Sequence, residues 1–306
     1  MRVQKTEGLV AAAPTPMNAD GSIRLELVAK QADMLSRNGV VGVFVCGSTG
    51  ESLSLTTQER MDVAERWAQV AGEGLKVIVH VGHNSVADSR ALAAHAQRIG
   101  AWATGAMAPC FFRPAGVSDL VEFCAQVAAA APRLPFYYYH IPSMTGVNMS
   151  MVDFLRAAGK KIPNLAGVKY TWEDLMDFAL AMDLDGGRYD MLFGRDEMLL
   201  CGLVLGARGA IGSTFNYAAP LYVKLIAAFD AGDLETARAL QRKSMLMIEC
   251  FKYRQPSPMA YNKAVMRMIG LDCGPVRPPL VNITEKQYEG LRADLEKIGF
   301  CEFCCK

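Results

Sequence analysis

The sequence contains no run of about eighteen consecutive apolar residues, although hydrophobic residues make up 51% of the chain. Because a helix needs about that many apolar residues to span a bilayer, no membrane-spanning helix is predicted. The opening segment, residues 1–7, carries charge and lacks the apolar core of a secretory signal peptide. These absences predict a cytoplasmic protein that has no membrane partner.

An excess of charge of either sign is also missing. Lysine and arginine total 32, aspartate and glutamate total 31, and the formal net charge is +1. Proteins that bind nucleic acids or anionic membranes usually concentrate basic residues in a stripe or a tail, and none stands out here. The sequence therefore disfavours both kinds of partner.

Histidine is scarce, with four residues in the chain, and these do not form a metal-binding pattern. The nine cysteines are an odd number, and most lie within apolar runs, which is typical of reduced, buried thiols. The tail holds Cys301, Cys304 and Cys305 but lacks a second ligand cluster at zinc-site spacing. We interpret this tail as a frayed terminus with oxidisable thiols, and we expect neither a metal nor a separate cofactor.

Short apolar runs alternate with amphipathic segments through the first two-thirds of the chain. The runs predict strands at residues 9–13, 41–46, 77–81, 103–107, 136–139, 165–169, 191–193 and 209–212. Eight strands separated by helices indicate a parallel sheet, and eight is the number that closes a (β/α)8 (TIM) barrel. The alternative, an open doubly wound sheet, usually has a glycine-rich phosphate loop after its first strand, and residues 11–16 are not one.

The strand signal disappears after Ser213. Residues 220–230, 234–252, 258–269 and 285–298 read as helices, with Asp233, Ser257 and Thr284 as N-caps. The first of these helices closes the barrel, and the others form a C-terminal helical extension. We therefore predict an α/β protein with a barrel that carries the catalytic site over residues 1–232 and an extension over residues 233–306.

Lys169 ends the sixth predicted strand, and active sites of such barrels form at the carboxyl ends of the strands. Desolvation above apolar walls would lower its pKa from about 10.4 to roughly 7–8, which frees the amine. A free amine condenses with a ketone, and the resulting iminium accepts electrons from a breaking C–C bond. Position alone fits equally well an ordinary strand-end lysine, with its stem packed or its ammonium paired with a carboxylate.

Other strand ends carry polar residues too. Ser48 and Thr49 lie between glycines that let a ligand approach the backbone N–H groups, which suits a carboxylate. The alternative is an ordinary turn in which these hydroxyls only form hydrogen bonds with neighbouring backbone groups. Tyr139 is the last of three tyrosines and could relay a proton, or pack as a hydrogen-bonded aromatic. Asp196 and Glu197 could bind substrate hydroxyls, or only favour the first turn of a helix.

Taken together, five motifs at these strand ends resemble the N-acetylneuraminate lyase / dihydrodipicolinate synthase superfamily. The motifs are Gly47-Ser-Thr-Gly-Glu51, Tyr139-His-Ile-Pro142, Gly167-Val-Lys-Tyr-Thr171, Gly194-Arg-Asp-Glu197 and Gly209-Ala-Ile-Gly-Ser213. The resemblance extends from about residue 8 to about residue 298, with the motifs in the family's order and spacing. Each motif alone is weak evidence, and five in order are strong.

The resemblance implies a role for each matching residue. It makes Lys169 the Schiff-base lysine and Tyr139 the proton relay. The covalent intermediate then forms on Lys169 itself, and no separate cofactor is expected. It assigns the substrate carboxylate to the loop of Ser48 and Thr49. It assigns the substrate's hydroxyl chain to Thr171, Gly194, Asp196, Glu197 and Ser213.

Two positions narrow the choice within the superfamily. The synthase branch usually has, in the place of Met144, an arginine that holds a dicarboxylic substrate, and methionine cannot do this. The stretch from Leu134 to Gly146 looks like the animal-type sialic acid lyases. Phe111 and Phe112 stand where many members carry two tyrosines, one reaching a neighbouring subunit's site, so a relay between subunits is in doubt here.

The resemblance thus implies a class I aldolase that reversibly cleaves N-acetylneuraminate to pyruvate and N-acetylmannosamine. The family usually forms homotetramers, which we expect here as well. One alternative is a pyruvate-dependent aldolase that acts on a 2-keto-3-deoxy sugar acid. Another is a non-catalytic paralogue that binds keto acids or sugars, although a pure binder would need neither Lys169 nor Tyr139.

Overall fold

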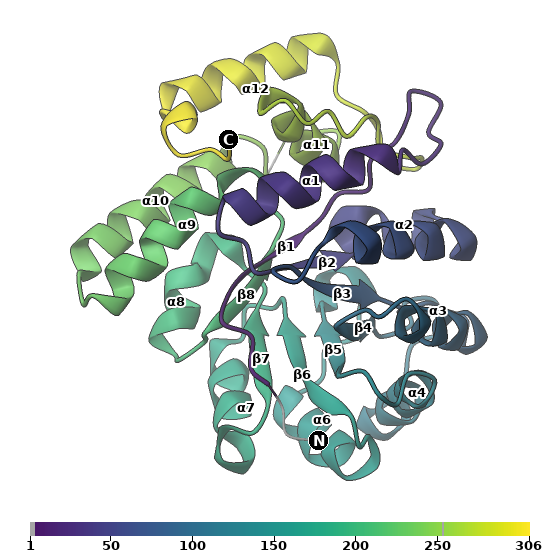
Figure 1. The fold of residues 1–306 in the computed structure, drawn as a ribbon. Coiled ribbons are helices and arrows are strands. Elements are labelled where there is room, and N and C mark those ends of the chain that lie inside the picture. Colours follow the sequence, from purple (N-terminus) through teal and green to yellow (C-terminus); the bar gives the residue numbers. More distant parts are fainter. Residues whose placement is uncertain (1–3, 253) are drawn as a thin grey trace.

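Eight parallel strands close into a barrel, each paired with the next and β8 paired with β1 (Figure 1). The computed structural model describes residues 4–252 and 254–306. The strands are β1 (Gly8–Ala12), β2 (Gly42–Val45), β3 (Lys76–His80), β4 (Ala103–Met107), β5 (Phe136–His140), β6 (Leu165–Tyr170), β7 (Asp190–Phe193) and β8 (Gly209–Gly212). Every predicted strand overlaps one of these, which confirms the (β/α)8 barrel.

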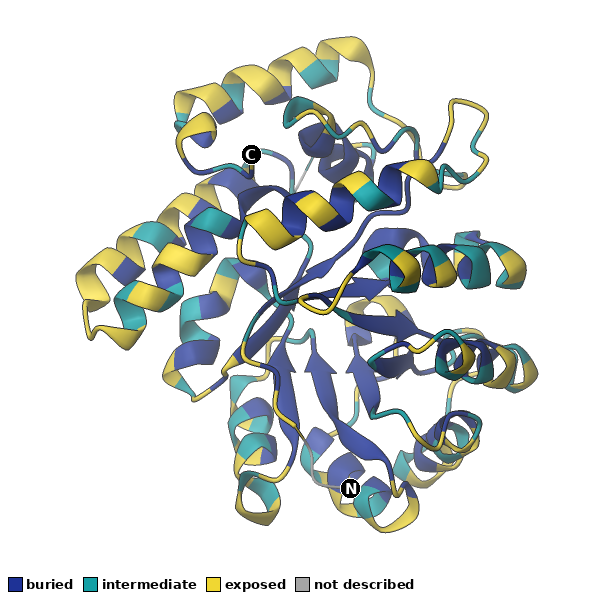
Figure 2. Cartoon of the chain, in the orientation of Figure 1, coloured by how far each residue is buried: buried dark blue, intermediate teal, exposed yellow. Residues whose placement is uncertain are grey.

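Helices surround the barrel and turn their apolar sides to it, so that the strands are buried and the outer helix faces exposed (Figure 2). They are α1 (Glu26–Arg37), α2 (Thr57–Val70), α3 (Val86–Arg98), α4 (Val117–Ala129), α5 (Pro142–Thr145), α6 (Met151–Lys161), α7 (Leu175–Gly187), α8 (Leu199–Val204) and α9 (Phe215–Asp230). Three short 3-10 turns accompany them, η1 (Ser48–Gly50), η2 (Ser52–Ser54) and η3 (Asp196–Met198). Side-chain caps start several helices, as Thr56 does for α2 by binding the N–H of Glu59.

The C-terminal part consists of α10 (Leu234–Glu249), α11 (Pro258–Met268), α12 (Glu285–Lys297) and the turn η4 (Phe300–Glu302). Asp233, Ser257 and Thr284 cap these helices with their side chains, as predicted. The last barrel helix begins at Phe215 rather than at residue 220, because α9 continues through a bend at Ala218 before Pro220. The boundary between the barrel at residues 1–232 and the extension at residues 233–306 remains a prediction. The first three residues of the predicted barrel lie outside the described residues.

The tail is packed, so the prediction of a frayed terminus was wrong. Phe300, Phe303 and Cys305 are buried, and the N–H of Cys305 donates to the carbonyl of Tyr217 at 2.7 Å. The carbonyl of Lys306 accepts a hydrogen bond from Asn38, just after α1. Apolar side chains hold this end of the chain in place. The spacing of the cysteines does not predict such packing. All nine cysteines are free thiols.

The inside of the barrel is filled by its own cluster of side chains. It contains Phe44, Tyr137, Tyr139 and Ile211, whereas Tyr138 packs on the outside against the helices. This alternation is the one expected for a strand, and it puts Tyr137 and Tyr139 together on the interior face. Across residues 4–252 and 254–306, the structure contains no helix with the length and apolar character needed to cross a membrane.

Candidate active site

A cavity of about 270 Å³ opens at the carboxyl ends of the strands. All nine predicted site residues line it: Ser48, Thr49, Tyr139, Lys169, Thr171, Gly194, Asp196, Glu197 and Ser213. They come from the ends of five strands that are well separated in the sequence. The closed barrel brings them together, because parallel strands deliver all their carboxyl ends to one rim.

Lys169 sits on β6 beside Tyr139 of β5, and the two Cα atoms are partners in the sheet. Its side-chain nitrogen lies 4.0 Å from the centre of the Tyr139 ring and 4.1 Å from that of Phe44. The residue is only 4% exposed, and this burial lowers the pKa of Lys169 to about 7, while the Asp196 carboxylate works in the opposite direction. Its amine is therefore substantially neutral near physiological pH.

Tyr139 joins Lys169 to the loop after β2. Its hydroxyl lies 3.3 Å from the Ser48 hydroxyl, within hydrogen-bonding distance. Its ring packs edge-on against Phe44 and His80, with centroid distances of 5.4 and 5.9 Å. Burial raises the pKa of Tyr139 to about 12, and the Ser48 hydroxyl acts against this rise. The phenol thus keeps its proton throughout the neutral range.

The loop after β2 needs glycine because it passes close to the barrel interior. A Cβ atom on Gly47 would lie 2.5 Å from the Phe44 ring. Ser48, Thr49 and Gly50 form one 3-10 turn, which Glu51 ends with a left-handed backbone at φ 62°. The turn places Ser48 and Thr49 in the cavity wall, while the Glu51 side chain is buried. The geometry suits an anion that meets hydroxyls and backbone N–H groups together.

Asp196 also lines the cavity, and it lies in η3. Its Oδ2 accepts hydrogen bonds from the Thr214 backbone N–H at 2.8 Å and the Thr214 hydroxyl at 2.6 Å. Burial raises the pKa of Asp196 to about 6, helped by the neighbouring Glu197 and opposed by the bonds from Thr214. Gly212 leaves room for this carboxylate, since a Cβ atom there would lie 2.1 Å from Oδ1.

The remaining predicted residues complete the wall near Asp196. Glu197 lies 3.4 Å from both the Arg195 guanidinium and the Lys252 ammonium, which fix its carboxylate. The buried hydroxyl of Thr171 acts together with that of Ser48 to oppose the rise in the pKa of Tyr139. Gly194 lies against the Thr171 hydroxyl, and a Cβ atom at position 194 would lie 2.1 Å from that hydroxyl.

Several lining residues were not predicted from the sequence, because they come from the helical extension. They are Ile248, Phe251, Lys252, Pro258, Met259 and Asn262. The hydroxyl of Tyr217 donates to Asn262 at 2.7 Å and fixes that amide at the cavity. These residues carry no motif; helical periodicity predicts that they are partly buried but not that they face the barrel mouth.

Met144 and the Phe111–Phe112 pair, which differ from many family members, are placed differently with respect to the cavity. Met144 lines the cavity at its rim and is 62% exposed. Phe111 and Phe112 are 76% and 84% exposed, stack edge-on with a centroid distance of 4.8 Å, and are not part of the cavity wall. Across residues 4–252 and 254–306, no three histidine, cysteine or acidic side chains are grouped so that they could hold a metal ion.

Comparison with known proteins agrees with this geometry. The dihydrodipicolinate synthetase family matches residues 5–298. N-acetylneuraminate lyase of Gallus gallus is 42% identical, over 96% of this chain and 97% of its own length, and that of Rattus norvegicus is 40% identical, over 98% and 95%. The solved structure of Proteus mirabilis N-acetylneuraminate lyase superimposes with a TM-score of 0.94 at 41% identity, covering 97% of this chain and all of that one. The family match spans nearly the whole chain and includes every strand end described above, so the protein belongs to the dihydrodipicolinate synthetase family.

Proposed function

We propose that this protein is a class I aldolase that reversibly cleaves N-acetylneuraminate to pyruvate and N-acetylmannosamine. One observation carries the proposal: the buried amine of Lys169 shares a cavity with the loop of Ser48 and Thr49 and with the hydroxyl of Tyr139. The names of the relatives at about 40% identity support the choice of sugar. We place the reaction in the cytoplasm and propose a homotetramer.

In the cleavage direction the reaction begins at Lys169. Its neutral amine attacks C2 of the open-chain sugar acid and, after loss of water, forms an iminium. Ser48, Thr49 and the N–H groups of their turn hold the C1 carboxylate. Thr171, Gly194, Asp196, Glu197 and Ser213 contact the hydroxyl chain and align the bond between C3 and C4.

The bond between C3 and C4 then breaks as the C4 hydroxyl loses its proton. The C4 oxygen becomes the aldehyde of N-acetylmannosamine, and the bond's electron pair moves into the iminium and yields an enamine. Tyr139, whose pKa of about 12 prevents it from resting as a phenolate, accepts the C4 proton while its own proton passes to the substrate carboxylate, either directly or through the Ser48 hydroxyl, which then gives up its own proton. Protonation of the enamine at C3 and hydrolysis release pyruvate and the free amine of Lys169.

A substrate comparison tests the sugar specificity. Purified protein should release pyruvate from N-acetylneuraminate with kcat/KM at least about tenfold above that for 2-keto-3-deoxy sugar acids, since hydrogen-bonded hydroxyls discriminate strongly. A lactate dehydrogenase-coupled assay measures the pyruvate. A preference for the shorter acids would overturn the choice of sugar, and ligand-dependent stabilisation without pyruvate release would indicate a binding protein instead.

The pH dependence tests the state of the lysine. Because Lys169 must be neutral to attack, kcat/KM for cleavage should rise about tenfold per pH unit well below pH 7 and level off above about pH 7.5. The sign follows from the lowered pKa, since raising the pH deprotonates more of the free enzyme's amine. A profile that still climbs between pH 9 and pH 10 would contradict a desolvated nucleophile.

A further inference from the structure

Glu51 belongs to the carboxylate-binding loop, yet its own carboxylate turns away from the cavity. Its side chain has no exposed area, and Glu51 is absent from the wall of the 270 Å³ cavity. Glutamate at φ 62° is an uncommon choice, because left-handed backbone favours glycine or asparagine. A buried charge on a strained backbone persists only when its surroundings hold it firmly.

The groups that hold Glu51 come from the helical extension. The side-chain nitrogen of Lys263, on α11, lies 2.6 Å from Glu51 Oε1, and the lysine side chain is only 4% exposed. The backbone N–H of Arg277 donates to Oε2 at 2.8 Å. Lys263 also donates to the carbonyl of Pro275 at 2.6 Å. Pro275 and Arg277 both belong to the connector between α11 and α12, residues 269–284, so this bond joins α11 to the connector.

The Arg277 side chain fastens that connector to the barrel. It donates to the Glu59 carboxylate at 2.5 and 2.8 Å, to the Ser54 carbonyl at 3.1 Å and to the Gly21 carbonyl at 2.8 and 3.0 Å. Glu59 belongs to α2 and Ser54 to η2, the elements that follow the carboxylate-binding loop. The extension therefore contacts both this loop and the two elements that follow it.

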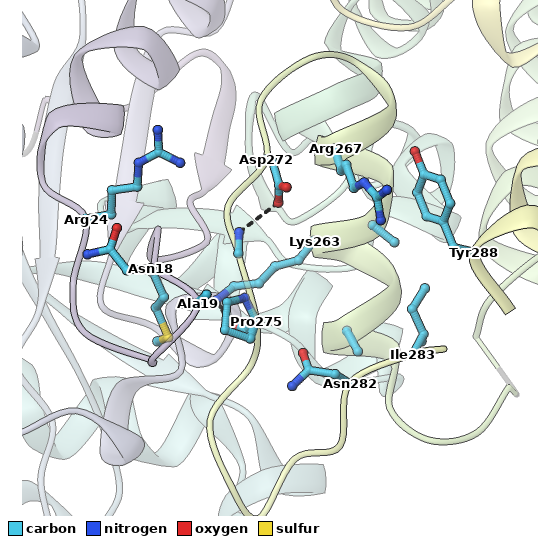
Figure 3. Close-up of a pocket in the computed structure, with 14 residues that line it drawn as sticks. Asn18, Ala19, Arg24, Lys263, Arg267, Asp272, Pro275, Asn282, Ile283 and Tyr288 are labelled. Carbon is cyan, nitrogen blue, oxygen red and sulfur yellow. Dashed lines mark hydrogen bonds between the residues drawn. The ribbon is translucent and has the colours of Figure 1, made fainter. Parts of the chain in front are cut away.

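A second cavity, of about 440 Å³, lies on the outer side of Lys263, between α11, the connector and residues 17–24 (Figure 3). Figure 3 shows the Lys263 side chain running from α11 toward Pro275 along its wall. Each of the three cations that line this cavity is already paired: Arg24 with Glu26, Arg267 with Glu285, and Lys263 with Glu51. The charge of Lys263 is thus directed at the loop and not at the second cavity.

The backbone of Glu51 transmits its position to the groups at the cavity. Its N–H donates to the Ser48 carbonyl at 3.1 Å and closes the turn that carries Ser48 and Thr49. The Ser48 hydroxyl in turn lies 3.3 Å from that of Tyr139. A shift of Glu51 would therefore move the hydroxyls and N–H groups that face the substrate carboxylate.

We propose that Lys263 is a positioning residue: its ion pair with Glu51 sets the loop conformation that binds the keto-acid carboxylate. The extension then determines affinity for the keto acid while leaving the amine chemistry of Lys169 unchanged. This inference rests on the proposed aldolase function. It predicts a defect confined to pyruvate binding, whereas a purely structural ion pair would affect stability alone.

The test uses Lys263→Met in the full-length protein. With pyruvate and borohydride, the pyruvate concentration that gives half-maximal trapping of Lys169 should rise at least tenfold, as measured by intact mass. In the condensation direction, the KM for pyruvate should rise in parallel, while the KM for N-acetylmannosamine and kcat change less than threefold. Arg267→Met on the same helix breaks an exposed ion pair and should behave as wild type in both assays.

Two further variants keep the result interpretable. Lys263→Arg retains the charge and should recover much of the pyruvate affinity. If Lys263→Met fails to fold, the double variant Glu51→Gln, Lys263→Met removes the unpaired buried charge and should fold with the same loss of pyruvate affinity. A folded variant without the ion pair that binds pyruvate like wild type would overturn the inference. Failure of wild type to be trapped by pyruvate would instead refute the proposed function.

Discussion

Replacing Lys169 with methionine should reduce cleavage of N-acetylneuraminate by about 10⁴-fold or more, because the nucleophile is lost while the cavity keeps its shape. Methionine matches the apolar stem of lysine and packs against Phe44 and Tyr139 in its place. Borohydride treatment with pyruvate should add mass to the wild type at Lys169 and none to the variant at any cavity residue. Trapping at another lysine would show that the wrong amine has been assigned.

The same substitution should stabilise the protein near and below pH 7. The pKa of Lys169 is about 7 in the folded state and about 10.4 when unfolded, so between these values the unfolded chain binds more protons. Stability therefore rises with pH over that window, and the cost of the buried ammonium is fully present below it. Removing the ammonium should raise the free energy of unfolding by on the order of 2–4 kcal/mol at pH 6. This figure already allows for the stabilisation that is lost when Asp196 loses its positively charged neighbour.

Thermal unfolding from pH 6 to pH 10 measures this effect. The advantage of Lys169→Met over wild type should shrink steadily as the pH rises toward 10. Lys76→Met supplies a control. Lys76 is the first residue of β3, at the end of the barrel opposite Lys169, and its ammonium lies over the Trp102 ring. A constant difference across the pH range would show that the lysine is not desolvated.

Replacing Tyr139 with phenylalanine should lower kcat for cleavage by about 10²- to 10⁴-fold with a small change in KM, as expected for a lost proton relay. The ring that contacts Lys169 remains, so the amine should keep its environment and its reactivity. Trapping of pyruvate on Lys169 should consequently survive in this variant. The loss is then confined to breaking the bond between C3 and C4, which rapid-quench measurement of pyruvate formation in a single turnover resolves.

The neighbouring tyrosine gives a matched control. Tyr138 lies on the same strand but faces the outer helices, and its buried hydroxyl has no hydrogen-bond partner among the described residues. Tyr138→Phe should leave kcat unchanged and leave stability equal or slightly higher, since removal of an unpaired buried hydroxyl costs nothing. Equal losses in both variants would point to a packing defect in β5 and not to proton transfer.

Much of this site could be predicted because a barrel converts order in the sequence into position in space. Each apolar strand ends at a residue that must lie on the same rim, so the sequence predicts that Ser48, Tyr139 and Lys169 share one site, and all three line one cavity. Alternation along β5 puts Tyr137 and Tyr139 on one face of the strand, and the closed barrel makes that face the interior. Both the shared rim and the shared face follow from local sequence patterns, because the closed sheet fixes where each pattern lies in space.

Residues that approach the cavity from the extension could not be predicted in this way. Asn262 and Met259 lie on α11, whose register against the barrel depends on side-chain packing and the course of the connector. The partner of Glu51 is equally hidden, because Lys263 follows it by more than two hundred residues and carries no motif. The prediction of a frayed tail was wrong for the same reason. Cys305 is held by tertiary contacts, and local sequence patterns do not reveal such contacts.

The covering of the barrel mouth by α10 and α11 has a consequence for the order of synthesis. A ribosome makes all eight strands, with Lys169 among them, before it reaches Ile248, Met259 and Asn262, which line the cavity. The cavity around Lys169 is therefore completed only after synthesis has passed Asn262, well after the lysine itself has been made.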